Sequence, residues 1–112
     1  MTSPRRAVRP LPDFFDSLDA QLEDERGPHG EPSRYDFLSL ELPKIMKLVA
    51  ARWDTLPELI PGRPEYRVMI ERGRLVAAYS VDAQLAPDGT IQLIRVRLEL
   101  EWPSEPDDET PD

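Results

Sequence analysis

Residues 66–102 alternate apolar and polar side chains, and this alternation constrains the fold more than any other feature of the sequence. A period of two is typical of strands that bury one face and expose the other. The stretch YRVMIERGRLVAAY, residues 66–79, has Arg72 and Gly73 at its centre, a pair that suits a tight two-residue turn. We therefore predict a first hairpin with one apolar face. Its paired residues are Ile70 with Leu75, Val68 with Ala77, and Tyr66 with Tyr79.

A second hairpin is predicted around APDGT, residues 86–90. If Asp88 and Gly89 alone form its loop, the apolar face continues and the arginines of the last strand face polar partners. The pairs in that register are Val81 with Val96, Tyr79 with Leu98, Ser80 with Arg97, and Asp82 with Arg95. A three-residue loop, Pro87–Gly89, would shift the pairing by one and turn both arginines toward the core. Burying two unpaired charges is costly, so we favour the two-residue register or a compensating bulge.

Two helices are predicted before the sheet. Pro12 suits a first helical turn, and Gly27 is a stop signal. The apolar face of this helix consists of Leu11, Phe14, Phe15, Leu18 and Leu22. Ser33 and Asp36 have the spacing of a capping box and open a second helix, which Pro43 kinks or divides. We expect an α+β fold with two N-terminal helices, the second kinked near Pro43, packed on one face of a small antiparallel sheet of three to four strands.

The length of 112 residues suits one domain. We divide the chain into a flexible N-terminus or short edge strand (1–10), a single α+β domain (11–102) and a disordered acidic tail (103–112). The tail holds five of the chain's carboxylates and no basic residue, and the net charge of the chain is −8. This balance argues against indiscriminate binding of nucleic acid, although it allows a local basic patch.

The sequence lacks the residues that several classes of functional site require. The chain has no cysteine, and its one histidine, His29, lies in a Pro/Gly loop, so we predict no disulfide, no metal site and no cofactor. The sequence contains no serine-hydrolase elbow, no Walker motif and no dinucleotide-binding glycine pattern. No segment approaches the roughly 18 apolar residues of a membrane span, so we expect no membrane contact and a cytoplasmic location.

Arginine supplies twelve of the fourteen basic residues. In the predicted registers, four of them share the polar outer face of the sheet: Arg67, Arg74, Arg95 and Arg97. The planar guanidinium suits bidentate contact with phosphate or carboxylate. A solvated surface balanced by its own acids explains the same face, because exposed ion pairs of this kind are common.

The two predicted helices are followed by the stretches YRV, RGRLVAAYSV and DGTIQLIRV. This arrangement resembles the RelE/ParE toxin superfamily over about half of the chain. The matching positions are Tyr66, Arg67, Gly73, Arg74, Tyr79, Asp88 and Gly89. In that superfamily two helices cover a small antiparallel sheet. The resemblance implies a toxin of a type II toxin–antitoxin pair, with an antitoxin as protein partner. The ribonuclease branch of the superfamily cleaves mRNA on the ribosome, and the gyrase-poisoning branch does not.

The resemblance also implies roles for individual arginines. Arg67, Arg74 and Arg97 would be catalytic, and Arg67, Arg95 and Arg97 would bind RNA. The ribonuclease pattern has an arginine late in the last strand, where this chain has Glu99. The alternative interpretation is a noncatalytic protein–protein interaction module of RelE-like shape.

Overall fold

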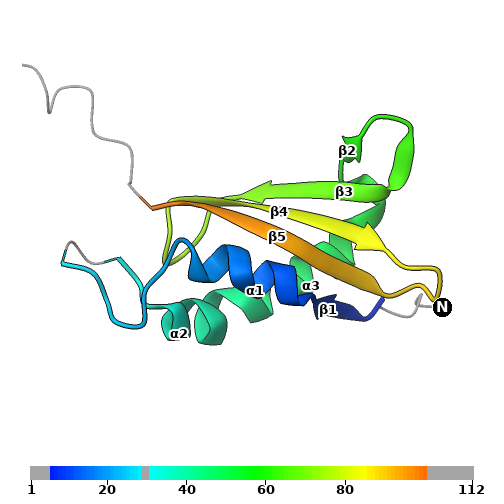
Figure 1. Cartoon of the computed structure of the whole chain (residues 1–112). Coiled ribbons are helices and arrows are strands. Elements are labelled where there is room, and N and C mark those ends of the chain that lie inside the picture. The colour runs from blue at the N-terminus through cyan, green and yellow to red at the C-terminus, as the bar shows by residue number, and fades with distance from the viewer. Residues whose placement is uncertain (1–5, 29–30, 101–112) are drawn as a thin grey trace, which may run out of the picture.

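The computed structural model describes residues 6–28 and 31–100, so His29 and the predicted acidic tail lie outside the described residues. Helices lie on one side of a long sheet, whose other side no described element covers (Figure 1). The helical segments are α1 (Pro12–Asp19), α2 (Arg34–Asp36), the π-helical turn η1 (Phe37–Glu41), α3 (Leu42–Arg52) and the 3-10 turn η2 (Trp53–Thr55). The strands are β1 (Val8–Pro10), β2 (Glu58–Ile60), β3 (Arg63–Glu71), β4 (Ala78–Leu85) and β5 (Ile91–Glu99).

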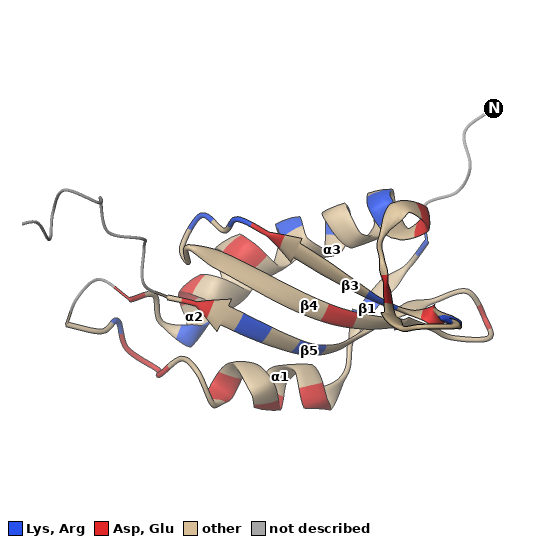
Figure 2. Ribbon diagram, turned by 90° about the horizontal axis from the view of Figure 1, so that it is seen from above, with Lys and Arg blue, Asp and Glu red and all other residues tan. Residues whose placement is uncertain are grey.

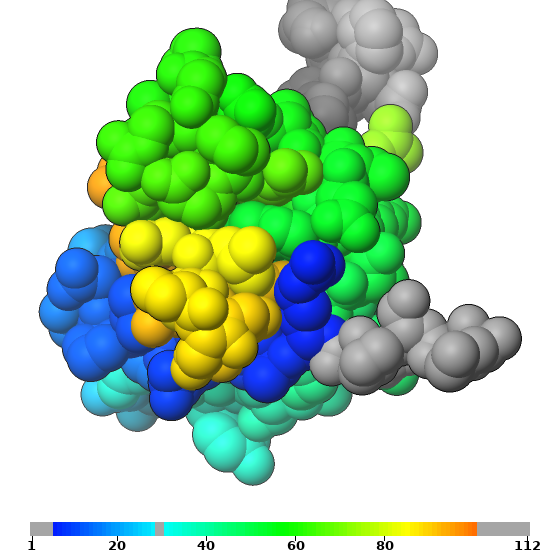
Figure 3. Space-filling model, turned by 90° about the vertical axis from the view of Figure 1, so that its right-hand side faces the viewer, coloured from blue at the N-terminus to red at the C-terminus, as the bar shows by residue number. Residues whose placement is uncertain are grey.

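The sheet has five strands in the order β1-β5-β4-β3-β2. β2 to β5 are antiparallel to their neighbours, whereas β1 runs parallel to β5 with Val8 opposite Ile91. A parallel pair needs a long crossover, and the chain between β1 and β5 includes the whole helical layer. Figure 3 shows the first described residues (dark blue) packed beside the β4–β5 turn (yellow). The α+β class is confirmed, but the sheet is mixed and larger than the predicted three to four antiparallel strands.

α1 lies beside the edge of the sheet as well as against its core. Phe14 and Leu18 are fully buried, and the helix ends at Asp19, well before the predicted stop at Gly27. Beyond β1, the backbone of β5 is bound by α1 and the turn that follows it. Ser17 Oγ accepts from Val96 N at 3.0 Å, and Gln21 accepts from Leu98 N at 2.8 Å and donates to Val96 O at 2.7 Å. These two side chains therefore replace a neighbouring strand at an edge that would otherwise be open.

Gln21→Ala is expected to lower the free energy of unfolding by about 2 kcal/mol, because each lost hydrogen bond contributes roughly 1 kcal/mol. The variant should also aggregate more readily, since the free backbone groups of β5 can pair with another strand. Urea denaturation and light scattering measure the two effects. Glu23→Ala is the matched control, because Glu23 is exposed two residues away. Equal losses in both variants would contradict the edge role of Gln21.

The second helical segment begins with the predicted capping box. Asp36 N donates to Ser33 Oγ at 3.0 Å, and Ser33 N donates to Asp36 Oδ2 at 3.1 Å. Helical structure then runs without a break from α2 through η1 into α3. Pro43 lies in the first turn of α3, where its missing N–H costs little, and the π-helical turn directly before it accommodates the ring. The predicted interruption near Pro43 is thus a change of helix type rather than a gap.

The capping box should weaken in acid. The pKa of Asp36 is lowered from 3.8 to about 2, first by its hydrogen bond from Arg26 and next by that from the Ser33 backbone. A lowered folded-state pKa means that this stabilisation is present above pH 3.8 and is lost as the pH falls toward 2. Thermal melts between pH 5 and pH 2 should show a steeper loss for the natural chain than for Asp36→Asn. Parallel curves would contradict the role of this carboxylate.

The register predicted for the first hairpin is wrong. Glu71 pairs with Tyr79 and Ile70 with Ser80, so residues 72–77 form a six-residue connection instead of a two-residue turn. Val76 and Ala77 are both buried, whereas adjacent residues of the predicted strand would point to opposite faces. The change shifts the pairing by an odd number of residues and exchanges the two faces of β3. Met69 now packs in the core at 2% exposure, and Ile70 is 70% exposed.

The favoured register of the second hairpin is confirmed in the half of the strands that lies away from the turn. Val81 pairs with Val96 and Asp82 with Arg95, and a bulge after Asp82 then sets Ala83 opposite Leu93. Near the turn the pairing therefore follows the three-residue alternative, with Gly89 at φ 90°. The bulge combines the two registers, so that apolar residues on both sides of it face the core.

The core lies between the helices and the face of the sheet that they cover. Its buried members are Phe14, Leu18, Leu22, Phe37, Leu42, Ile45, Val49, Trp53, Met69, Val76, Tyr79, Val81, Ala83, Ile91, Leu93 and Val96. Every long strand and both helical segments contribute to this cluster, which makes the described part a single packed unit.

Candidate functional site

The side of the sheet away from the helices presents a surface of mixed chemistry, which we call the uncovered face. It consists of Arg9 from β1, Tyr66, Val68 and Ile70 from β3, Ala78, Ser80, Asp82 and Gln84 from β4, and Gln92, Arg95, Arg97 and Glu99 from β5. Figure 2 views the molecule from this side, with basic positions along β5 and an acidic position in β4. Three bases and two acids leave an excess of only one positive charge, so the face is not a strongly electropositive surface.

Asp82 lies at the centre of the uncovered face and is only 3% exposed. Its neighbours across the sheet are Val68 and Arg95, and Arg97 Nη2 donates to Asp82 Oδ2 at 3.4 Å. Asp82 Oδ1 has no hydrogen-bond partner among the described residues. A buried carboxylate oxygen without a donor is unfavourable, so Asp82 holds unused capacity to accept a hydrogen bond.

A groove of about 270 Å³ opens at one end of the face, and Arg97, which donates to Asp82, forms part of its lining. Its lining comes from all three strands: Ile70, Ala78, Tyr79, Ser80, Arg97, Leu98 and Glu99. Ile70 is 70% exposed on its rim, and the side chain of Arg97 is 62% exposed. An exposed isoleucine next to a largely exposed arginine combines apolar contact with a directional charged donor.

Arg67, predicted to share this face with Arg97, lies on the opposite side of the sheet. Its guanidinium donates to Trp53 O at 2.9 Å, Leu56 O at 3.3 Å and Pro64 O at 2.8 Å. It also stacks over the Trp53 ring, 5.3 Å from the centroid. The side chain satisfies carbonyls at the end of the α3–η2 segment, so its contacts are those of a structural arginine.

Arg74 lies in the 72–77 connection, and its side chain is exposed. It is therefore on neither face of a strand, contrary to the predicted hairpin. The structure brings together Arg95 and Arg97 but separates them from Arg67 and Arg74. The four arginines do not form the single cluster that was predicted from the sequence.

One buried carboxylate, Glu41, was not predicted from the sequence and is 1% exposed. Glu41 Oε1 accepts from Arg74 N at 3.0 Å and from Leu75 N at 2.9 Å, and Oε2 lies 3.2 Å from Arg74 N. Glu41 thereby anchors the 72–77 connection to the helical layer. The available signal was its position midway between Phe37 and Ile45, where a charge interrupts an apolar stripe of period four.

Tyr79 is the other buried polar side chain near this anchor. Burial first, and then the charges of Glu41 and Glu71, raise the pKa of Tyr79 to about 12. Its hydroxyl has no hydrogen-bond partner among the described residues. A phenol with a raised pKa is a poor acid or nucleophile near neutral pH, so it does not indicate catalysis.

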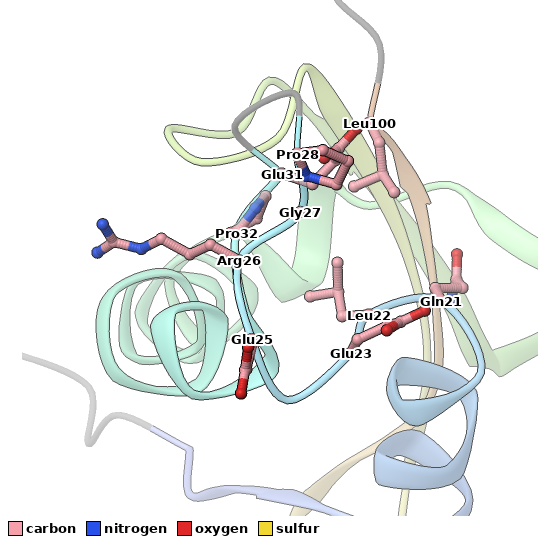
Figure 4. Close-up of a pocket in the computed structure, with 10 residues that line it drawn as sticks. All are labelled: Gln21, Leu22, Glu23, Glu25, Arg26, Gly27, Pro28, Glu31, Pro32 and Leu100. Atoms are coloured by element: carbon pink, nitrogen blue, oxygen red, sulfur yellow. The ribbon is translucent and has the colours of Figure 1, made fainter.

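A second pocket, of about 360 Å³, lies where the loop after α1 meets the end of β5 (Figure 4). Leu22, Pro28, Pro32 and Leu100 supply apolar walls, and Arg26 extends away from the pocket. The acids around it do not converge with a nucleophile. Within residues 6–28 and 31–100, no group of three or more His, Asp or Glu side chains is placed to hold a metal ion.

No protein-family model matches the chain, and comparisons with curated proteins and with solved structures gave no match either. None of the described helices has the length and apolar character needed to cross a membrane.

Proposed function

We propose that this chain is a protein-binding module of RelE/ParE-like shape, and that a partner protein docks on the uncovered face. The observation that carries this proposal is Ile70, which is 70% exposed beside Arg97 on a sheet surface that no described element covers. In the toxin–antitoxin interpretation of the sequence, the partner would be an antitoxin.

The composition of the face suits a protein partner better than a nucleic acid. Protein interfaces are enriched in arginine and aromatic residues and depleted in lysine, and this face has three arginines, Tyr66 and no lysine. Binding to a phosphate backbone depends on several uncompensated basic residues. Here three arginines share the face with two acids, which leaves an excess of one positive charge, and the whole chain has a net charge of −8.

The binding proposal predicts which substitutions abolish capture of a partner. A tagged chain, expressed in its own cells and purified at low salt, should retain the partner, and Ile70→Asp should lose it by at least about tenfold, since buried charges oppose docking. Leu40→Asp is the matched control, because Leu40 is a 58% exposed apolar residue of η1, in the helical layer. Equal loss in both variants would contradict docking on the uncovered face.

A second candidate is a toxin that acts on RNA, and the exposed pair of Arg95 and Arg97 favours it. Two arginines at alternate positions of one strand can contact adjacent phosphates. On this hypothesis, induced expression arrests growth, and Arg95→Ala with Arg97→Ala relieves the arrest while the protein stays folded. Normal growth with the natural chain, in a strain that lacks any antitoxin, would count against this candidate and leave the binding proposal intact.

A further inference from the structure

Positive charge remains available on the uncovered face after its internal contacts are made. Arg95 is exposed and forms no hydrogen bond or ion pair within the described residues. Arg97 has one contact, the 3.4 Å hydrogen bond to Asp82, and its side chain is 62% exposed. Both guanidinium groups can therefore take a carboxylate in addition to their present contacts.

A dense source of carboxylates begins directly after β5. The last described residue, Leu100, lies three positions after Arg97, and residues 101–112 contain six acids and no base. At about 3.3–3.6 Å per residue, a twelve-residue segment reaches up to roughly 40 Å, which is enough to return over the sheet. Covalent attachment gives such a segment an effective concentration on the order of millimolar.

We propose that residues 101–112 bind the uncovered face of their own chain, with carboxylates against Arg95 and Arg97. The inference goes beyond the proposed function, because it concerns contacts within one chain. If a partner also uses this face, the acidic segment competes with it, and partners that bring their own carboxylates to the arginines displace it best.

The test uses the full chain with a neutral version of the segment. The six substitutions are Glu101→Gln, Glu105→Gln, Asp107→Asn, Asp108→Asn, Glu109→Gln and Asp112→Asn. Backbone amide NMR signals of Ser80 and Arg97 are expected to shift, whereas that of Val49 in the helical layer should not. About 1 M NaCl should produce the same shifts in the natural chain and almost none in the neutral variant, because the Debye length falls to about 3 Å.

Two charge-reversal variants identify the binding face. Arg95→Glu with Arg97→Glu should release the segment, so that its signals match those of the neutral variant and no longer respond to salt. Lys44→Glu with Lys47→Glu makes the same change in net charge on exposed positions of α3 and should leave the segment signals unchanged.

Three results would overturn the inference. The first is that neutralising the segment leaves the Ser80 and Arg97 signals in place. The second is that the lysine control releases the segment as fully as the arginine variant does. The third is that the shifts depend on protein concentration, which would assign the contact to a second copy. Failure to find a protein partner leaves all three measurements unaffected, so the inference and the proposed function can fail separately.

Discussion

Glu41→Ala is expected to lower the free energy of unfolding by about 3 kcal/mol. The change removes a buried acceptor and leaves the backbone N–H groups of Arg74 and Leu75 without their partner. Hydrogen bonds to a charged group contribute roughly 1.5–3 kcal/mol each, and unsatisfied buried donors add a further cost. Urea denaturation at neutral pH measures the loss. Amide hydrogen exchange should increase mainly in residues 72–77, because Glu41 anchors that connection.

Two further variants separate this role from a general effect on the helix. Glu41→Gln keeps an oxygen that both N–H groups can share, so its loss should be less than half that of alanine. Lys44→Ala, at an exposed position on the following turn, should change stability by no more than about 0.5 kcal/mol. A Glu41→Ala variant as stable as Lys44→Ala would show that the connection holds its shape without the carboxylate.

Arg67→Ala should destabilise the fold by about 2 kcal/mol, because three backbone carbonyls lose a charged donor and the Trp53 ring loses a stacked guanidinium. Arg67→Met keeps the apolar stem over Trp53 and should recover part of the loss. Thermal and urea denaturation of the purified variants give the comparison.

Arg97→Ala is the matched comparison for Arg67→Ala, because Arg97 is largely exposed and makes one long hydrogen bond. Its effect on stability should stay within about 1 kcal/mol. If Arg67→Ala were instead neutral for stability yet abolished a cellular activity, the structural role of Arg67 would be wrong and the catalytic prediction would gain support.

The two hairpins show what local sequence can predict here. In the second hairpin, pairing Asp82 with Arg95 and Ser80 with Arg97 predicts the register of the half away from the turn, because the alternative buries two charges. Near the turn, beyond the bulge after Asp82, the strands follow the three-residue alternative. In the first hairpin, Arg72 and Gly73 resemble a tight turn, but the deciding contact comes from Glu41, far away in the sequence. Turn residues cannot reveal a contact of that kind.

The arginine site was misplaced for the same reason. Once the register of β3 changes by an odd number, Arg67 moves to the side of Trp53, and Tyr66, Val68 and Ile70 move to the uncovered face. The predicted face therefore contained too many arginines and too few apolar residues. Ser33 and Asp36 were predicted correctly because a capping box depends only on residues three apart.

The parallel pairing of β1 with β5 has a consequence for the order of folding. β3, β4 and β5 follow one another in sequence, so they can pair through local contacts. Val8 and its partner Ile91, in contrast, are separated by nearly the whole described chain. Closing so long a loop is slow relative to hairpin formation. We therefore expect β1 to be the last strand to join the sheet during folding and the first to separate from it during unfolding. In the interval, the β5 backbone next to Ile91 is exposed, and a newly made chain has its greatest chance of pairing there with another molecule.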